Sequence, residues 1–276
     1  MVPAARPTRH RYAIDLHAEL GLTTPPARRD ARALPPGTPP VSVVIPTLNE
    51  APNLPHVFAR LPEGLHEVIV VDGASTDGTV EVARALRPDV RIVLEPRRGK
   101  GRALASGFAA VTGEIIVMID ADGSTDALEI PRYVAALVNG ADFVKGSRFA
   151  QGGGSSDITT ARRVGNRALN GLVNSLYRTS YTDLCYGFNA FWTRCLPYLR
   201  IDCDGFEVET LINVRAAKAG LVVHEVPSFE RDRLHGESNL SAVRDGLRVL
   251  RTIGTERVPP RWRGRFVRRD RTEAAS

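Results

Sequence analysis

The chain has 276 residues, 43% of them hydrophobic, which is enough to bury one large core or two small ones. Its net charge is +6, and its three cysteines form no Cys-x-x-Cys pair, a sparse set that suits a reducing cytosol. No zinc finger, basic zipper or RNA-recognition motif is present, which argues against nucleic acid as a partner, and no apolar stretch reaches the roughly 20 residues of a membrane span.

The two ends of the chain carry much of its positive charge. Residues 1–40 combine six arginines with many prolines, a composition typical of a disordered leader, and they lack the apolar run of a signal peptide. Residues 256–276 form a second basic tail, with six arginines between positions 257 and 269. Such runs are usually solvated, but they also suit an anionic membrane surface or a polyanion.

Between residues 41 and 150, short β-branched runs alternate with segments of helical pattern. The predicted strands are Val41–Ile45, Glu67–Val71, Arg91–Leu94, Ile115–Ile119 and Asp142–Lys145. The predicted helices lie near residues 51–60, 78–87, 101–111 and 127–138, and Thr76–Thr79 supplies capping residues before the second of them. Because strands that alternate with single helices form right-handed crossover units, we expect an α/β fold with a largely parallel sheet.

After residue 150 the pattern changes. The glycine- and serine-rich run Gln151–Ser156 predicts a flexible loop, which either closes over a bound ligand or merely connects. Beyond it we expect a helix near 161–178, an apolar aromatic segment at Tyr186–Trp192, a helix near 206–219 and a strand near 221–226.

A last amphipathic helix is predicted from about Leu240 to Ile253. Its apolar positions fall on one face and its arginines on another: Val243, Leu247, Leu250 and Ile253 against Arg244, Arg248 and Arg251. Two interpretations stay open, a surface helix packed on the core or a basic helix that lies on a membrane.

Two carboxylates, Asp120 and Asp122, directly follow the apolar run predicted as the strand 115–119. Residues two apart in a strand point to the same side, so both side chains would aim at one point beyond the strand end, where open α/β sheets bind ligands. Mg²⁺ and Mn²⁺ take such hard oxygen ligands and often bring a diphosphate with them. The pair therefore predicts a divalent metal site, with a solvated loop or helix cap as the alternative.

Other predicted strand ends add polar groups to the same sheet edge. The first strand runs into Ile45–Glu50 and the second into Val71–Thr79, where Asp72 is able to accept from the ring N–H of uracil or guanine or simply to form a turn. The first strand is not followed by Gly-x-Gly-x-x-Gly, and the glycines of residues 97–102 do not match a phosphate loop. A dinucleotide site of the Rossmann type is therefore not supported.

Four segments in this order and spacing resemble family 2 glycosyltransferases of the GT-A fold: VVIPTLNE, VDGASTDGT, RRGKGRALASG and DADGS. Later segments are similar to the dolichol-phosphate mannose synthase-like branch: KGSRF, ARRVGNRALN, TDLCYGFNAF and DRLHGESNL. The resemblance covers roughly residues 41–252. It implies a Rossmann-like nucleotide-diphospho-sugar transferase over residues 41–255, with a nucleotide-binding half at 41–150, an acceptor half at 151–255 and a mostly parallel central sheet flanked by helices.

The resemblance also implies roles for residues of the first half. The nucleoside and diphosphate would be bound by Pro46, Leu48, Glu50, Asp72 on the base, Lys100 near the base or diphosphate, and Ala121. Asp120 would contact the ribose or the metal, and Asp122 would bind the metal directly. Ser124 stands where many relatives have a glutamine ligand, which leaves the third protein ligand open.

In the second half, the resemblance implies basic residues that grip the acceptor phosphate and the donor diphosphate: Arg148, Arg162 or Arg163, and Arg233. Ser238–Leu240 replaces the Ser-Lys-Leu of the branch and removes one positive charge. Glu207 and Glu209 are candidates for the general base that a hydroxyl acceptor needs, or they are acids of a first helical turn. Asp183 either positions the sugar or caps a turn.

Together these features predict a metal-dependent inverting glycosyltransferase that uses Mg²⁺ or Mn²⁺. It would pass mannose or glucose from GDP-mannose or a UDP-hexose to a polyprenyl phosphate, in the cytoplasm and peripherally at the cytoplasmic membrane face. One alternative is the same fold with a soluble hydroxyl acceptor. Another is a non-catalytic basic protein that tethers nucleotide or membrane. The sequence leaves the oligomeric state open.

Overall fold

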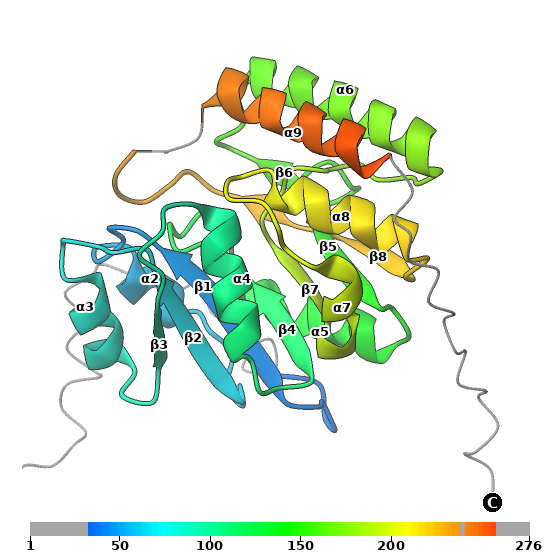
Figure 1. The fold of residues 1–276 in the computed structure, drawn as a ribbon. Coiled ribbons are helices and arrows are strands. Elements are labelled where there is room, and N and C mark those ends of the chain that lie inside the picture. Colours follow the sequence, from blue (N-terminus) through cyan, green and yellow to red (C-terminus); the bar gives the residue numbers. More distant parts are fainter. Residues whose placement is uncertain (1–32, 238–240, 258–276) are drawn as a thin grey trace, which may run out of the picture.

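Seven strands form a central sheet in the computed structural model, which describes residues 33–237 and 241–257 (Figure 1). Their spatial order is β3-β2-β1-β4-β7-β5-β8. The bounds are β1 Val41–Thr47, β2 Glu67–Asp72, β3 Arg91–Leu94, β4 Ile115–Met118, β5 Phe143–Ser147, β7 Asn189–Trp192 and β8 Val223–Pro227. Only β7 runs antiparallel to its neighbours β4 and β5, while the other pairs in the sheet are parallel. This arrangement confirms the expected α/β class.

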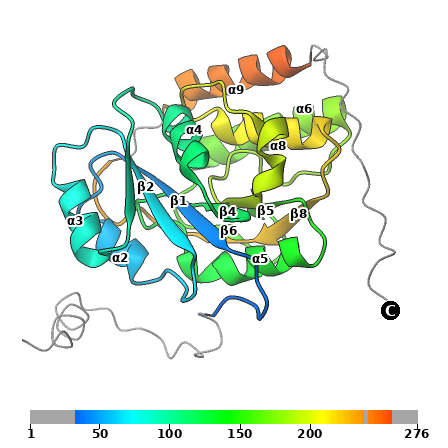
Figure 2. The same cartoon turned by 60° about the horizontal axis from the view of Figure 1, so that its bottom comes forward.

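Helices cover both faces of the sheet, as its apolar strands require. One face packs against α2 (Leu54–Phe58), α3 (Thr79–Leu86), and α5 (Ile130–Val138) with its preceding 3-10 turn η2 (Ala127–Glu129). The other packs against α4 (Lys100–Ala110), α7 (Leu196–Leu199) with the 3-10 turn η3 (Thr193–Cys195), and α8 (Val208–Lys218). Figure 2 shows the sheet between these two layers. Strand alternation explains the sorting, since Val43 and Ile45 face the first layer and Val44 faces the second.

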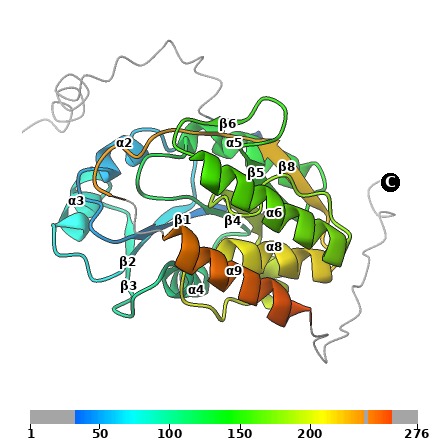
Figure 3. The same ribbon diagram turned by 90° about the horizontal axis from the view of Figure 1, so that it is seen from above.

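Two further helices, α6 (Thr160–Tyr177) and α9 (Ala242–Glu256), lie side by side beyond α8 (Figures 1 and 3). The core between these helices includes Val173, Val249 and Ile253. The apolar stripe predicted for α9 is therefore only partly correct, because Leu247 and Leu250 are exposed. The buried positions follow the i, i+4 spacing that ends at Ile253 and leave the other apolar face toward solvent.

The glycine- and serine-rich run is not a free loop throughout. Gly154–Ser155 forms strand β6, which pairs in parallel with β9 at Phe229–Glu230. A side chain at Gly153 would collide with the carbonyl oxygen of Ser147, and one at Gly154 would lie 2.8 Å from the Phe229 ring. The glycines here permit close packing, which corrects the prediction of simple flexibility.

The predicted leader ends earlier than residue 40. Ala33 forms a parallel bridge with Glu63, and Leu34 packs against the first core. The predictions about the tails and the missing lysine fall on residues 1–32, 258–276 and Ser238–Leu240, which lie outside the described residues. Among the helices of the described ranges, none has the length and hydrophobicity to cross a bilayer.

The packing of α4 on the sheet gives a first test. We expect Gly107→Ala to lower the free energy of unfolding by about 1–2 kcal/mol, because its added methyl would lie 2.6 Å from Val44 and 2.7 Å from Val71, both in the core. The matched change Gly171→Ala in α6 meets open space and should raise stability by about 0.5–1 kcal/mol through helix propensity. Urea unfolding of both variants measures the signs, and equal effects would contradict this account of the α4 packing.

Candidate functional site

A cleft of about 940 Å³ opens beyond the carboxyl ends of β1 and β4. Its walls come from the segments after these strands, from the start of α4, and from α8, α6 and α9. Both halves of the chain therefore contribute to one site. Eleven of the residues predicted from the sequence line it: Pro46, Leu48, Glu50, Lys100, Asp120, Ala121, Asp122, Arg148, Arg162, Glu209 and Arg233.

The two aspartates reach the cleft by a different route from the one predicted. Strand β4 ends at Met118, so Asp120 and Asp122 lie in a loop and strand alternation does not place them. Ala121 between them is buried, and Gly123 turns the chain with a φ of 75°. A side chain at Gly123 would also collide with Leu234 at 2.6 Å, so glycine is required there for two reasons. Both carboxylates still line the cleft.

Lys100 joins two acids at the base of the cleft. Its Nζ lies 2.5 Å from Asp120 Oδ1 and 2.6 Å from Glu209 Oε1. Burial alone would lower the pKa of Lys100, but the two carboxylates hold it above its ordinary value. Burial raises the pKa of Glu209 although Lys100 opposes the shift. Gly187 makes room for this cluster, since a Cβ there would lie 2.5 Å from Asp120 Oδ2 and 2.9 Å from Lys100 Nζ.

Arg233 joins a second pair of acids. Its Nη1 lies 3.0 Å from Glu50 Oε1, and its Nη2 lies 3.2 Å from Asp122 Oδ2. Burial raises the pKa of Glu50, while hydrogen bonds from Asn53 and Arg233 oppose the shift. The segment that carries Arg233 lies along the aspartate loop, because Leu234 N donates to Asp122 O at 3.3 Å. The guanidinium therefore stands between the end of β1 and the aspartate pair.

The donor set fits a divalent cation that is shared with a phosphate ligand. Asp120 and Asp122 offer carboxylate oxygens to the same cleft, and Asp122 Oδ1 already accepts from Ser124 N at 3.0 Å. In the described ranges, no cluster of three or more His, Cys, Asp or Glu side chains is arranged to hold a metal alone. Mg²⁺ is commonly bound by one or two carboxylates plus substrate phosphates and water, so two aspartates are sufficient.

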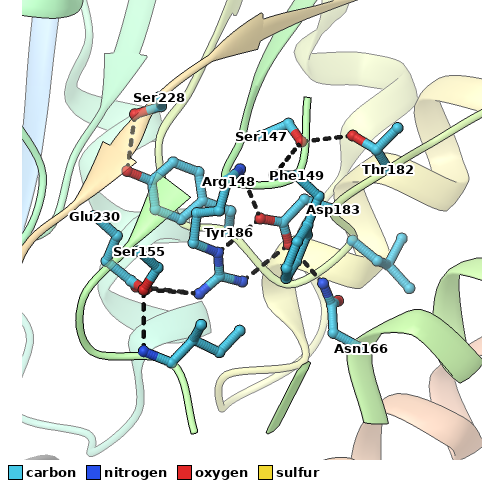
Figure 4. Close-up of polar contacts among 12 residues, drawn as sticks. Ser147, Arg148, Phe149, Ser155, Asn166, Thr182, Asp183, Tyr186, Ser228 and Glu230 are labelled. Carbon is cyan, nitrogen blue, oxygen red and sulfur yellow. Dashed lines mark hydrogen bonds and ion pairs between the residues drawn. The ribbon is translucent and has the colours of Figure 1, made fainter. Parts of the chain in front are cut away.

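Arg148 is tied into a buried network (Figure 4). Its Nε and Nη2 donate to the two oxygens of Asp183 at 2.7 and 2.9 Å, and its Nη1 donates to Glu230 at 3.0 Å. Asn166 Nδ2 donates to the same Asp183 at 2.9 Å, and Ser155 Oγ donates to Glu230 at 2.5 Å. Two carboxylates already occupy the guanidinium that was predicted to grip a phosphate. Arg148 instead connects the end of β5 with α6, β6 and β9.

Asp183 is fully buried and belongs to the Arg148 network. It has neither of the two predicted roles, positioning the sugar or capping a turn. It neither lines the cleft nor caps a turn, and it also accepts from the backbone N–H of Arg148 at 3.1 Å. Burial by itself would raise the pKa of Asp183, but the hydrogen bonds and charge of Arg148 hold it below its ordinary value.

Three predicted site residues lie off the cleft surface. Asp72 is buried and its Oδ2 accepts from Ser75 N at 3.0 Å, so neighbouring Gly73 forms the wall instead. Glu207 is buried, accepts from Gly205 N at 3.2 Å through Oε1, and its Oε2 has no partner among the described residues. Arg163 is exposed on α6, whereas Arg162 lines the cleft and lies 2.9 Å from Asp157.

The segment 204–206 was not predicted from the sequence as part of the site, although it forms part of the cleft wall. Gly101 N donates to Asp204 O at 2.9 Å, and side chains at Gly99 or Gly101 would collide with the backbone of Cys203 and Asp204. The glycines around Lys100 therefore let the start of α4 pack against the approach to α8. In the sequence, the glycines at positions 99 and 101 indicate a close backbone contact, but they do not show which segment makes it.

The sequence resembles known glycosyltransferases. The model of the family described as Glycosyl transferase family 2 matches residues 42–196. Glycosyltransferase AglJ of Haloferax volcanii is 32% identical over 209 residues, which cover 75% of this chain and 68% of that protein. An uncharacterised glycosyltransferase of Mycobacterium tuberculosis is 38% identical over 202 residues, which cover 73% of this chain and 89% of that protein.

Solved structures of glucosyl-3-phosphoglycerate synthase from Mycobacterium tuberculosis share the fold. The complex with Mn²⁺, UDP and glucosyl-3-phosphoglycerate is 26% identical, with a TM-score of 0.65 over 86% of both chains. The complex with Mn²⁺, UDP-glucose and phosphoglyceric acid is 25% identical, with a TM-score of 0.66 over 87% of both chains. A further complex of that enzyme holds Mg²⁺ and UDP. These likenesses confirm the expected GT-A fold.

The Arg148 network predicts that the substitution Asp183→Asn lowers the free energy of unfolding by a large amount that depends on pH. We expect Asp183→Asn to lower the free energy of unfolding by about 3 kcal/mol at pH 7, because it leaves a buried guanidinium short of a charge partner. The pKa of Asp183 is lowered in the folded state, so its stabilising effect is complete well above the ordinary aspartate value of about 3.9 and is lost below it.

Urea unfolding at several pH values checks this prediction. The difference between wild type and Asp183→Asn should be the same at about pH 7 and pH 5 and should narrow below about pH 4. Asp157→Asn is the matched control, since Asp157 pairs with Arg162 at the surface and should contribute less than about 1 kcal/mol. Equal costs for the two variants would refute the structural role of Asp183.

Proposed function

The chain belongs to glycosyl transferase family 2, and we propose that it transfers mannose or glucose from a nucleotide-diphospho-sugar to a polyprenyl phosphate, with inversion at the anomeric carbon. Family membership makes the chain a glycosyltransferase and removes the non-catalytic tether as an alternative. The proposal concerns the donor, the metal, the acceptor and the place of action.

The donor half of the cleft supports binding of a nucleotide-diphospho-sugar. Pro46, Leu48 and Gly73 form one wall, and Asp72 lies directly behind that wall. The related glucosyl-3-phosphoglycerate synthase structures contain UDP or UDP-glucose, which favours a UDP-hexose as donor here, with GDP-mannose as the alternative. A panel of both nucleotide classes in one binding assay separates them.

Asp120 and Asp122 are the residues that would hold the divalent cation, Mg²⁺ or Mn²⁺. When bound, the cation would neutralise charge on the diphosphate that leaves with the nucleotide. The protein supplies further positive charge on both sides of the aspartates, through Lys100 at 2.5 Å from Asp120 and Arg233 at 3.2 Å from Asp122. Cations that are fixed in place before the reaction stabilise negative charge as it develops on a leaving group.

The residues that line the acceptor half of the cleft support a lipid phosphate as the acceptor. Ile158, Leu169 and Val249 give its wall an apolar part, and three arginines line the same region: Arg162, Arg244 and Arg248. A phosphate group joined to a hydrocarbon chain matches both features. Such an acceptor is already ionised at neutral pH and needs no general base. An acceptor of this kind would hold the enzyme at the cytoplasmic membrane face as a peripheral protein.

A second candidate is a soluble hydroxyl acceptor, favoured by one specific observation. Glu209 lines the cleft, is buried beside Lys100, and has a raised pKa. A carboxylate in this position suits proton removal from a hydroxyl. The related synthase structures contain phosphoglyceric acid, a small soluble molecule, in complexes with nucleotide and metal.

We expect Asp122→Asn to lower the rate of sugar transfer by about 10²–10³-fold, because it removes one cation ligand. In the wild type, UDP together with Mn²⁺ should raise the melting temperature, and the variant should lose this shift while keeping its melting temperature without ligand. Asp89→Asn is the control, since Asp89 is exposed and pairs only with Arg87 among the described residues. Full activity of Asp122→Asn would end the metal-site proposal.

Glu209→Gln and Glu207→Gln distinguish the two acceptors. For a lipid phosphate, the rate with Glu207→Gln should stay within about three-fold of wild type, and Glu209→Gln should lower it only about ten-fold by freeing Lys100 from a partner. For a hydroxyl acceptor, Glu209 must lose its proton to act, so the rate should rise with pH through its raised pKa.

In that second case Glu209→Gln should abolish the rising limb of the pH–rate profile and cost about 10²–10⁴-fold. Nucleotide binding, measured in parallel, controls for a damaged donor site. Assays with a short-chain polyprenyl phosphate and with phosphoglyceric acid as acceptors identify which profile applies.

A further inference from the structure

The outer surface of the α6–α9 helix pair combines exposed apolar and basic side chains. On α6, Val164 is 63% exposed and Leu172 is 38% exposed. On α9, Leu247 is 63% exposed and Leu250 is 45% exposed. The two helices pack against each other, and Figure 3 shows them side by side on one side of the molecule. The four apolar side chains therefore belong to one pair of adjacent helices.

These exposed apolar side chains do not belong to the core of the domain, because each of the two helices buries a different face in it. On α9, Val249 and Ile253 pack into the core that also holds Val173 of α6. The α6 residues Asn166 and Asn170 are buried as well and bond to the segment 182–183. Each helix thus has one face fixed to the domain and a second apolar face toward solvent.

This surface carries an excess of positive charge. Its exposed basic residues that do not line the cleft are Arg163 and Arg167 on α6 and Arg251 on α9, while the exposed Arg244 and Arg248 line the cleft. The sequence of α6 contains no acidic residue, and α9 has two. Of these, Asp245 is buried, and Glu256 is bound to Arg215 and Lys218. The chain that follows α9 adds five more arginines between positions 261 and 269.

We propose that the outer surface of α6 and α9 docks on an anionic lipid bilayer, with Val164, Leu172, Leu247 and Leu250 entering the interface and Arg163, Arg167 and Arg251 contacting lipid phosphates. A helix surface with leucine and valine between arginines has the composition of an interfacial membrane helix. A second copy of the chain is a poor occupant, because two such surfaces would bring their arginines together. The negative surface of a bilayer complements the charge and accepts the apolar side chains.

The same two helices also line the cleft, through Arg244 and Arg248 and through residues outside the proposed docking surface. Ala161, Gly165 and Leu169 of α6 and Val249 of α9 face the acceptor half of the site. Docking through the outer surface would therefore hold the acceptor half beside the lipid layer, where a polyprenyl phosphate resides. In this respect the inference rests on the proposed function, and it deepens that function by naming the surface that brings the enzyme to its acceptor.

Flotation with lipid vesicles tests the docking surface without donor or acceptor. Wild type should bind phosphatidylcholine vesicles that contain about 30 mol% phosphatidylglycerol, should bind pure phosphatidylcholine weakly, and should be released as NaCl rises from about 0.1 to 0.5 M. The double variant Leu247→Ser with Leu250→Ser should bind about ten-fold more weakly. Arg167→Gln with Arg251→Gln should bind about 25-fold more weakly, at about five-fold per arginine.

Matched controls lie on a different part of the surface. Leu94→Ser and Arg84→Gln change an exposed leucine on β3 and an exposed arginine on α3, and both should bind vesicles within about two-fold of wild type. The proposed surface would be overturned if the control variants lost as much vesicle binding as the test variants. It would also be overturned if both double variants bound vesicles as strongly as the wild type. A wild-type dimer that the Leu247 and Leu250 changes dissociate would also overturn it, in favour of self-association.

Transfer to a short, water-soluble polyprenyl phosphate separates failure of this inference from failure of the proposed function. None of the four substituted positions on α6 and α9 lines the cleft, so the double variants should keep this soluble activity. Transfer without vesicle binding in the wild type would remove the docking surface and leave the function standing. Vesicle binding without transfer to any lipid phosphate would remove the proposed acceptor and leave the surface.

Discussion

Two cations hold four carboxylates together in one cleft, and the site depends on this balance. Glu50, Asp120, Asp122 and Glu209 converge there, and carboxylates at such short range repel one another unless positive charge lies between them. Lys100 joins Asp120 to Glu209, and Arg233 joins Asp122 to Glu50. Because each cation comes from a different segment, the start of α4 and the loop before α9, the acids at the strand ends keep their positions only when the whole chain is folded.

The Arg148 network also holds carboxylates together around one cation, and its charged residues are buried. It joins β5, α6, β6 and β9 through a guanidinium that is bonded to two buried carboxylates. Burial of such groups is costly unless every one is paired, so the network is stable as a complete set and weak when any member is removed. It fixes α6 against the sheet, and α6 in turn supplies Arg162 and Leu169 to the acceptor side of the cleft. The geometry of the site is thus set partly by residues that never reach its surface.

The local pattern of the chain was enough to predict the strands β1 to β5, the parallel character of the sheet and eleven of the residues that line the cleft. Those features follow from short apolar runs and from polar groups placed just after them. Pairings between distant residues could not be obtained in the same way. Arg148 meets Asp183 and Glu230 across 35 and 82 positions, and nothing near Arg148 in the sequence names either partner. Strand β7 was seen only as an aromatic segment, since its antiparallel direction is decided by the neighbours it joins. On α9, two apolar faces compete, and the tertiary contact with Val173 decides which one is buried.

The seven-stranded sheet also limits how this molecule can move. Its ladder of backbone hydrogen bonds continues from β3 to β8, so the nucleotide side and the acceptor side share one rigid plate and no swivel point separates them. Admission and release of substrates must then come from segments at the rim of the cleft. Exchange of those rim segments between relatives offers a route to new acceptor preferences while the plate, and the nucleotide chemistry built on it, stays unchanged.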